Sequence, residues 1–448
     1  MVAAEVDETA IEVFAHYYRL LEHGETGMIP ESSIEPIDME SLAEAEVSDE
    51  VAASAIGTTV VIKLNGGLGT SMGMDRAKSL LCVRRGLSFL DIIARQVLHV
   101  RKEYDATLPL IFMNSFRTSA DTMAALNRYH DLPVEGLPLE FLQSKEPKLL
   151  EKDLSPVLFT KDPDLEWCPP GHGDLYPSLR STGVLDKLID AGYTQAFVSN
   201  SDNLGAVPDP RVAGWFAQSG APFAIEAVRR TPSDRKGGHF ARRKNDGRIV
   251  LRETAQTPPK DQAALADLER HRFCSTNNLW FDLVEMRKAL VVRDGVLGLP
   301  MIRNVKTVDP ADASTPKVVQ IETAMGAAIE IFGESRLIEV TRERFVPVKT
   351  TNDLLVLRSD VYDLGKDFVM DQTSDTLPFV DLDARHYRLV GDFDKRFPEG
   401  APSLVKARSL KVAGDWTFGS GVKVVGDVQL DKGSTAQRIA PGTVLSDG

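Results

Sequence analysis

Apolar runs of strand length alternate with segments of helical spacing through the middle of this chain. Runs rich in β-branched or aromatic residues lie at 58–65, 109–114, 139–143, 195–200 and 222–228. Helical spacing separates them, as in 183–192 and in 88–104, where Ser88 and Asp91 occupy capping-box positions. Elements that alternate at these lengths are typical of α/β proteins, so we predict a mostly parallel sheet with helices on both faces.

Further elements are predicted after and around this alternating region. A second capping pattern, Thr118 with Asp121, predicts a helix that follows the run at 109–114. Beyond residue 230 the alternation loosens, and the stretches 248–253 and 277–283 are predicted to be strands of a second layer. Thr350 opens one more predicted helix.

The N-terminal segment, residues 1–57, is predicted to be acidic and helical. Its first helix, within 4–22, carries an apolar face, formed by Ile11, Phe14, Tyr18 and Leu21. Residues 23–56 contain two prolines and many acids, and we expect them to cross the surface before a second short helix.

Glycine-punctuated, alternating stretches mark the C-terminal residues 383–448. The Gly-Asp pairs at 414–415 and 426–427 are 12 residues apart. Strand–turn units at this spacing predict a small β-helix or stacked hairpins. We therefore divide the chain into the N-terminal segment 1–57, a main domain at 58–382 and a C-terminal module at 383–448.

Charge is distributed unevenly along the 448 residues. The net charge is −13, and the first 50 residues alone, with 14 acids and one base, account for all of it. The rest of the chain is neutral and offers no global basic field for a nucleic acid. Residues 229–252 hold nine Lys and Arg against two Asp. This segment is either a solvated hairpin tip, which composition alone favours, or a flap near an anionic small molecule.

Cysteine usage and hydropathy bear on the compartment. Cys82, Cys168 and Cys274 form no CxxC pair, which argues against a disulfide scaffold or a zinc site and fits a reducing cytosol. We expect Cys82 and Cys274 to be small buried apolar groups. No apolar run approaches the roughly 20 residues of a membrane span, and the acidic start lacks a signal-peptide pattern, so we predict a cytoplasmic protein without membrane contact.

A glycine-rich loop follows the first strand. It reads Leu64-Asn65-Gly66-Gly67-Leu68-Gly69-Thr70-Ser71-Met72-Gly73, with Lys78 five residues later. The P-loop spacing G-x-x-x-x-G-K-[ST] is not met, and the third glycine of a dinucleotide fingerprint is displaced to Gly73. That displacement weakens an NAD-dependent oxidoreductase as an alternative. A tight structural turn needs fewer glycines, so we predict a nucleotide-phosphate loop of a third kind.

Several blocks along the chain carry a resemblance to a known family. They are VVIKLNGGLGTSMG with AKSLL, FMNSF at 112–116, FLQS at 141–144, PPGHGDLYPSL at 169–179, FVSNSDNLGA at 197–206, RKGG at 235–238, STNNLWFDL at 275–283, QIETAMGAAI at 320–329 and RFVPVKTTNDLLVLRSDVY at 344–362. In this order they resemble the eukaryotic-type UTP–glucose-1-phosphate uridylyltransferases (UDP-glucose pyrophosphorylases) over roughly residues 58–430.

The resemblance implies a fold, a reaction and a set of site residues. The fold would be a Rossmann-like nucleotidyltransferase domain of the GT-A type with a mixed, mainly parallel sheet, followed by a left-handed β-helix. The reaction would join UTP and α-D-glucose 1-phosphate into UDP-glucose and pyrophosphate, reversibly and with Mg²⁺. Catalytic roles fall to Lys78, His172 and Lys349; nucleotide binding to Leu64, Asn65, Gly66, Gly67, Gln143, Gly171 and Asp202; sugar binding to Gly238, Glu253, Asn277 and Glu322; and the metal to Asp202.

Two alternatives remain at this stage. The same chemistry on galactose 1-phosphate or an N-acetylhexosamine 1-phosphate is the nearer one, although the loop TSMGMDRAK lacks the additional arginine of the N-acetylhexosamine enzymes. A catalytically silent homologue used for binding is the other, and the presence of Lys78, His172, Asp202 and Lys349 weighs against it. The expected partners are UTP and glucose 1-phosphate, with no nucleic acid and no membrane, and the expected assembly is a monomer or homodimer.

Overall fold

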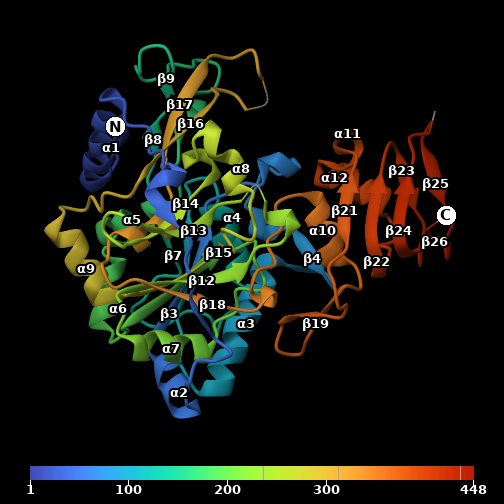
Figure 1. Ribbon diagram of the computed structural model, residues 1–448, viewed down its shortest axis with the longest axis horizontal. Helices are drawn as coiled ribbons and strands as arrows, with labels where there is room; N and C mark the ends of the chain where they lie inside the picture. Colours follow the sequence, from blue (N-terminus) through green and yellow to red (C-terminus); the bar gives the residue numbers. More distant parts are fainter. Residues whose placement is uncertain (236, 311, 434, 448) are drawn as a thin grey trace.

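An eight-stranded mixed sheet runs through the centre of the protein (Figure 1). The computed structural model describes residues 1–448 apart from Lys236, Ala311, Ser434 and Gly448. Across the sheet the strands are β2 (Glu40–Ser41), β18 (Arg336–Glu339), β12 (Phe223–Arg229), β15 (Phe273–Asp282), β11 (Gln195–Asn200), β3 (Thr59–Asn65), β6 (Leu110–Asn114) and β7 (Glu140–Leu142). The apolar runs predicted as strands therefore lie side by side in one sheet.

All neighbouring pairs in this sheet are parallel except the two that β15 makes. β15 is antiparallel to β12 on one side and to β11 on the other. The prediction that 277–283 belongs to a second layer is therefore wrong, because β15 is a central strand. Its side chains are buried on both faces, and Trp280 and Phe281 have no exposed surface, as befits a strand covered on two sides.

Helices cover both faces of the sheet, as predicted. Alternate residues of β3 point to opposite faces, so Val61 joins one hydrophobic core and Val60 and Ile62 join the other. The helices packed on the first face are α2 (Asp49–Gly57), α3 (Phe89–Tyr104), α7 (Pro210–Ser219) and α10 (Thr351–Arg358). Those on the second face are α5 (Leu175–Ser181), α6 (Val184–Asp190) and α9 (Leu283–Val292).

The predicted helix starts have mixed outcomes. Ser88 and Asp91 form the capping box of α3, and Thr350 forms one with Asp353 at the start of α10. The helix α4 (Ser119–Leu126) also begins after the expected residue, Thr118, but its hydroxyl makes no cap. That hydroxyl instead accepts a hydrogen bond from the Ser115 amide at 2.9 Å. Thr118 therefore shapes the preceding loop and does not cap the helix.

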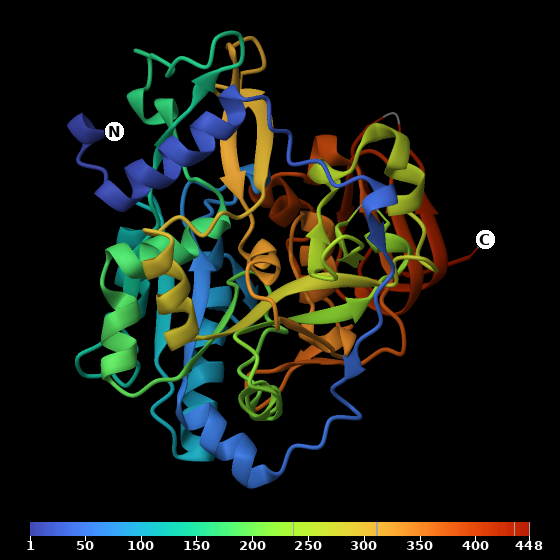
Figure 2. The same ribbon diagram turned by 60° about the vertical axis from the view of Figure 1, so that its left-hand side comes forward.

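The N-terminal segment packs against two small sheets of the main domain. α1 (Glu8–Glu22) buries Tyr17 and Leu21 against the antiparallel sheet of β16 (Met301–Thr307), β17 (Lys317–Thr323) and β9 (Leu149–Leu150), beside which Figure 2 shows it. Of the predicted apolar face only Leu21 is buried. Ile11, Phe14 and Tyr18 stay partly exposed, and Tyr17, which was not predicted, is buried. After α1 the chain adds β1 (Ile34–Glu35) to a second small sheet.

That second small sheet explains the basic segment. β13 (His239–Arg243) and β14 (Ile249–Arg252) form the expected hairpin, and β1 pairs with β13. Two of its arginines are paired with carboxylates of the protein. Arg252 has no exposed surface and donates to Glu31 at 2.6 Å, and Arg243 pairs with the largely buried Glu330. The acidic N-terminal segment thus supplies a counter-charge to the basic hairpin.

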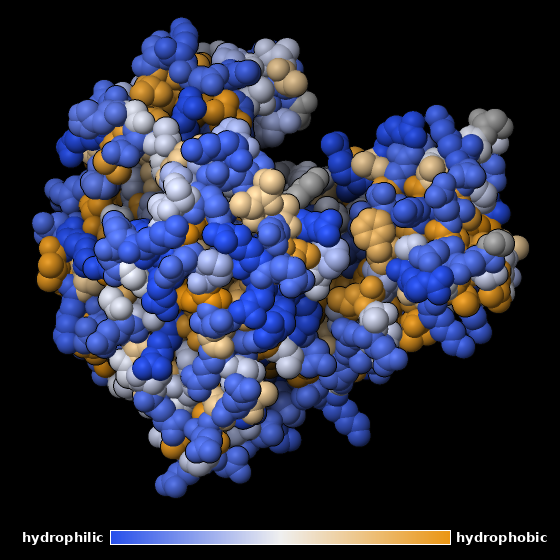
Figure 3. Space-filling model, in the orientation of Figure 1, coloured by the Kyte–Doolittle hydropathy of each residue, from blue (hydrophilic) through white to orange (hydrophobic). Residues whose placement is uncertain are grey.

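The C-terminal strands form two parallel sheets. One contains β21 (Phe379–Leu382), β22 (Ser403–Val412), β24 (Lys423–Leu430) and β26 (Val444–Ser446), and the other contains β23 (Trp416–Phe418) and β25 (Gln437–Ile439). From β22 onward, paired residues are 18 to 21 positions apart, so the 12-residue spacing of the Gly-Asp pairs does not mark one turn of the chain. Parallel pairing also excludes stacked hairpins, because hairpin strands are antiparallel. Figure 3 shows the surface hollowed between these strands and the rest of the molecule.

The remaining sequence predictions on composition have clear outcomes. Cys274 and Cys168 are buried, but Cys82 is exposed, so its expected burial is wrong. Within the described residues no helix is long and apolar enough to cross a membrane.

The remaining α-helices and paired strands are short. The helices are α8 (Gln262–Leu265), α11 (Ala384–Tyr387) and α12 (Val390–Arg396). The two-stranded pairs are β4–β5 (Cys82–Arg84, Leu87–Ser88), β8–β10 (Glu146–Pro147, Trp167–Cys168) and β19–β20 (Tyr362–Leu364, Met370–Gln372).

Candidate active site

Three parallel strands end in asparagines at the same edge of the sheet. Asn65, Asn114 and Asn200 are the last residues of β3, β6 and β11. The Asn65 amide donates to Asn114 Oδ1 at 2.8 Å and to Thr122 Oγ1 at 2.9 Å, and its oxygen accepts from Ser201 at 3.1 Å. Asn65, predicted to bind nucleotide, is 3% exposed, and its amide is committed to holding the strand ends together.

The glycine loop begins where β3 ends. Gly69 and Gly73 adopt φ values of 64° and 75°, which side chains rarely tolerate. Gly66 lies against the Gln143 amide, since a Cβ there would be 2.7 Å from Gln143 Oε1. Gly67 faces open space. The structure thus brings together Gly66 and Gln143, two of the predicted nucleotide contacts, and leaves the backbone of Gly67 accessible.

Lys78 and Asp202 form an ion pair across the edge of the sheet. The Lys78 Nζ donates to Asp202 Oδ2 at 2.7 Å and to the carbonyl of Val348. Both side chains are about one-fifth exposed, at 17% and 22%. The Lys78 amide donates to the Gly67 carbonyl at 3.1 Å, which ties the lysine to the glycine loop. The predicted phosphate-binding lysine and the predicted metal ligand therefore meet.

A cavity of about 520 Å³ opens beside this ion pair. Six of the predicted site residues line it, namely His172, Asp202, Gly238, Glu253, Asn277 and Lys349. A different cavity of about 600 Å³ lies near the end of α3 and contains none of the predicted residues. The site defined by the motifs is therefore the first cavity, together with the glycine loop joined to it through Lys78.

His172 is held in one protonation state. The Met325 N–H donates to His172 Nδ1 at 2.9 Å, so Nδ1 is the acceptor and Nε2 carries the proton. Burial lowers the pKa of His172, while Glu322 opposes the shift. Its loop is close-packed, because a Cβ at Gly171 would meet the Thr323 backbone at 2.6 Å. The glycines of this motif thus permit contact with β17, and they leave a neutral donor at the cavity.

Glu253, Gly238 and Asn277 form one wall of the cavity. A Cβ at Gly238 would lie 2.7 Å from Glu253 Oε2, so only glycine fits beside this carboxylate. Burial raises the pKa of Glu253, and the charge of Lys349 partly offsets that. Asn277 has a φ of 57°. It lines the cavity, whereas its neighbour Asn278 is fully buried.

Glu322 lies apart from this wall. Its Oε1 accepts hydrogen bonds from Asn304 Nδ2 at 3.0 Å and Lys306 Nζ at 3.2 Å, both on the neighbouring strand β16. It does not line the cavity with Glu253 and Asn277. The structure therefore places it where it supports the His172 loop and the β16–β17 hairpin.

Some residues that shape the site were given no role from the sequence, although most of them lie inside the quoted blocks. Asp234, Ser275, Thr276 and Pro347 also line the cavity. Beneath it, the fully buried Lys63 donates to Ser199 Oγ at 2.6 Å and Ala206 O at 2.7 Å, and so braces both ends of the loop that carries Asp202. Burial, helped by Arg344, lowers the pKa of Lys63 to about 7. A lysine inside the apolar run TTVVIKLN was the available signal, since a buried charge needs partners.

Comparisons with known proteins give the site a context. A family model described as UTP–glucose-1-phosphate uridylyltransferase matches residues 11–425. The enzyme of that name from Pyrus pyrifolia is 37% identical over 398 residues, which cover 88% of this chain and 82% of the relative. The one from Hordeum vulgare is 38% identical over 393 residues, covering 87% of this chain and 80% of the relative.

Solved structures agree with these relatives. The UDP-glucose phosphorylase of Trypanosoma brucei superposes with a TM-score of 0.92 at 41% identity. The superposition covers 100% of this chain and 96% of the Trypanosoma chain. A mutant of the Leishmania major UDP-glucose pyrophosphorylase in complex with UDP-glucose superposes with a TM-score of 0.93 at 40% identity. The superposition covers 100% of this chain and 97% of the Leishmania chain.

The family match and the superposed structures define the protein as a nucleotidyltransferase. Within that class, the chain belongs to the UTP–glucose-1-phosphate uridylyltransferase family. Family membership removes the NAD-dependent oxidoreductase alternative, which the displaced glycine had already weakened.

Proposed function

We propose that this protein converts UTP and α-D-glucose 1-phosphate into UDP-glucose and pyrophosphate. The observation that carries the proposal is the meeting of three groups at one cavity: the Lys78–Asp202 ion pair, the neutral donor His172 and the polar wall of Glu253 and Asn277. Cations and fixed donors suit two phosphates, and amides and carboxylates suit sugar hydroxyls.

The reaction requires two anionic substrates to be aligned. The sugar-phosphate oxygen forms a bond to the α-phosphorus of UTP while the bond to the bridging oxygen breaks, and pyrophosphate leaves with the electron pair. Lys78 would exchange part of its contact with Asp202 for the triphosphate and stabilise that leaving charge. Lys349, exposed at the rim of the cavity, would add a second cation. No covalent enzyme intermediate is needed, because positioning and charge stabilisation supply the catalysis.

Base and sugar recognition follow from the same geometry. Gln143, packed on Gly66, would read an edge of the uracil through its amide. Leu64 and Gly171 would also contact the nucleotide. Gly238, Glu253 and Asn277 would face the hexose.

Mg²⁺ is the proposed cofactor. Among the described residues no group of three or more His, Cys, Asp or Glu side chains could hold a metal. A single carboxylate completed by phosphate oxygens and water is nevertheless a normal magnesium arrangement, so the donor set at Asp202 fits. When bound there, the ion would neutralise part of the triphosphate charge.

We also propose the fold type, the domain boundaries, the assembly and the cellular compartment of this protein. The mixed sheet with ligand-facing strand ends supports a Rossmann-like domain of the GT-A type at 58–382. The parallel coils of the C-terminal strands support a left-handed β-helix at 383–448, although β21, the first strand of that sheet, begins at Phe379. We further propose a monomer or homodimer in the cytoplasm, to which three free thiols are suited.

The test is pyrophosphate release by the purified protein with UTP, Mg²⁺ and a panel of sugar 1-phosphates. We expect release with glucose 1-phosphate, and a loss of roughly 10²-fold or more in kcat for Lys78→Ala, because the leaving charge loses its cation. Lys288→Ala, which removes an exposed lysine that is paired with Glu285 on α9, is the matched control and should keep full activity. Release with galactose or N-acetylhexosamine 1-phosphate alone would overturn the choice of sugar. UTP binding without release from any sugar would establish a silent homologue.

A further inference from the structure

A carboxylate with no exposed surface lies directly behind the sugar-facing wall. Glu226, on β12, sits inside the apolar run PFAIEAV and has no contact with the cavity. Its Oε2 accepts from Arg344 Nε at 2.6 Å and from Asn278 Nδ2 at 2.9 Å. Its Oε1 accepts from Arg344 Nη2 at 2.7 Å and from Trp280 Nε1 at 2.9 Å. Every oxygen of this buried charge is therefore satisfied, as burial requires.

Glu226 faces an irregularity in the neighbouring strand. Ile225 pairs with Leu279 and Ala227 pairs with Ser275, so the single residue Glu226 faces three residues of β15. The three are Thr276, Asn277 and Asn278. Extra residues in one strand leave the regular ladder and re-aim side chains, which is how bulges serve active sites.

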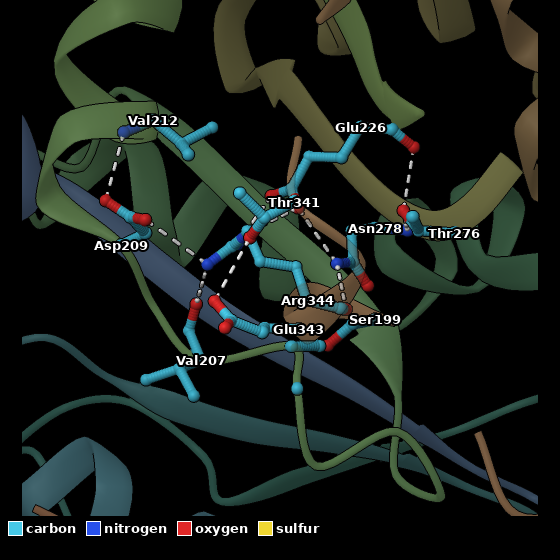
Figure 4. A network of polar contacts seen from close by, with 12 residues as sticks. Ser199, Val207, Asp209, Val212, Glu226, Thr276, Asn278, Thr341, Glu343 and Arg344 are labelled. Atoms are coloured by element: carbon cyan, nitrogen blue, oxygen red, sulfur yellow. Dashed lines mark hydrogen bonds and ion pairs between the residues drawn. The ribbon is translucent and has the colours of Figure 1, made fainter. Parts of the chain in front are cut away.

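Both flanks of this bulge are tied to Glu226, as Figure 4 shows for the labelled residues. The Thr276 hydroxyl donates to the Glu226 carbonyl at 2.7 Å, and the Asn278 amide donates to the Glu226 carboxylate at 2.9 Å. Thr276 Oγ1 also accepts from the Asn278 N–H at 3.1 Å, which closes the bulge. Asn277, between two pinned neighbours, has a φ of 57° and lines the cavity.

The same network reaches the loop that carries Asp202. The Arg344 carbonyl accepts from Asn203 Nδ2 at 3.1 Å and from Asn278 Nδ2 at 3.3 Å. Asn203 follows Asp202 directly, and its oxygen accepts from the Val346 N–H at 2.8 Å. One buried ion pair thus fixes the backbone on two sides of the cavity.

We propose that Glu226 is a positioning residue for sugar recognition, because its carboxylate and carbonyl clamp the bulge that presents Asn277 to the hexose. This role rests on the proposed function, since it takes Asn277 to contact the sugar. Asparagine adopts left-handed backbone more readily than other residues with a side chain, but the conformation still costs free energy, which the contacts on both sides of Asn277 offset. Loosening the clamp should therefore displace Asn277 and spare the nucleotide half of the site.

The test compares binding of UDP-glucose with binding of UDP by calorimetry, because the difference isolates the sugar. In Glu226→Asp the charge for Arg344 remains but the carboxylate is one methylene shorter. We expect the Kd of UDP-glucose to rise about tenfold, the loss of roughly one well-placed hydrogen bond, and the Kd of UDP to change less than about twofold. Asp91→Asn is the matched control, since Asp91 is a buried carboxylate on α3 that is paired with Arg128, and neither residue lines the cavity.

A second pair of variants leaves the buried charges untouched. Thr276→Val removes the hydroxyl that binds Glu226 and should weaken UDP-glucose selectively, whereas Thr276→Ser keeps a hydroxyl and should restore binding. Equal weakening of UDP and UDP-glucose in the folded variants would overturn the clamp and indicate a merely structural role, as would unchanged binding of both. Failure of the unmodified protein to bind UDP-glucose more tightly than UDP would instead count against the proposed function.

Discussion

At the scale of single residues, His172 has the most sharply defined chemistry. Its Nδ1 accepts the Met325 N–H, and burial lowers its pKa, so the ring is neutral and Nε2 is the donor. The PPGHGD motif indicated that a histidine belongs here. Which nitrogen donates could not be read from the sequence, because it depends on an amide 153 residues further along the chain.

We predict that His172→Leu lowers kcat/KM by roughly 10²-fold, because a donor to phosphate or sugar oxygen is lost. His172→Gln should recover part of that loss, since its amide N–H can replace Nε2. A histidine whose pKa is lowered stays neutral until the pH falls below its ordinary value of 6.5. The native kcat/KM should therefore show no titration of His172 as the pH falls to 6.5. Equal activity of the Leu and Gln variants in steady-state assays would contradict this assignment.

Lys63 and Glu226 show a second kind of residue at this scale. Each is a charged side chain inside an apolar strand run, and each is fully buried with polar partners. The apolar runs predicted the strands correctly, but they did not show which groups pair with the buried charges of Lys63 and Glu226. The partners Ser199 and Arg344 lie more than a hundred residues away, so only the fold reveals them.

At the scale of elements, the site depends on how strands and helices begin and end. At α10 the sequence predicted the start of the helix at Thr350, and the structure adds the capping-box partner Asp353. Asp353 Oδ2 accepts from the Thr350 N–H at 2.7 Å and also from the Lys349 N–H at 2.8 Å. The cap therefore holds the backbone of the predicted catalytic lysine as well as the helix.

We predict that Asp353→Ala lowers both stability and activity. The free energy of unfolding should fall by about 1 kcal/mol, the usual value of a cap, and kcat should fall because Lys349 loses its anchor. Ser88→Ala removes a comparable cap at α3, away from the cavity, and should cost similar stability without affecting kcat. Parallel denaturant unfolding and steady-state kinetics separate the two effects. Equal loss of kcat in both variants would show that stability alone is responsible.

At the scale of the whole molecule, acidic residues of the N-terminal segment form ion pairs with arginines of the main domain. Glu31 of the N-terminal segment accepts from Arg252 at 2.6 Å and from Arg270 at 2.6 Å, and Asp38 pairs with Arg272. Burial opposes ionisation of Glu31, but donors from Arg270, His271 and Arg252 outweigh it and lower its pKa to about 2. The N-terminal segment is thereby fastened over the hairpin that begins beside Gly238.

We predict that Glu31→Gln lowers the free energy of unfolding by roughly 3 kcal/mol near neutral pH, because the fully buried Arg252 would lose its counter-charge. A carboxyl with a lowered pKa contributes stability above its ordinary pKa of 4.5, and that contribution is lost as the pH falls toward 2. The difference between native protein and variant should therefore shrink in acid. Glu35→Gln, at an exposed position of β1, is the control and should unfold like the native protein. A constant difference at all pH values, measured by denaturant unfolding, would refute the pairing.

The sequence by itself determined the local features: the strand and helix alternation, the cap of α3, the start of α10 at Thr350, the glycine loop and the motif residues around the cavity. These depend on periodicity, backbone freedom and short-range hydrogen bonds, which neighbouring residues carry. Only the tertiary structure decided that β15 is a central antiparallel strand, that Asn277 faces the cavity while Asn278 is buried, and that acidic and basic segments neutralise each other. Those outcomes depend on contacts between residues far apart in the chain, and no local pattern specifies them.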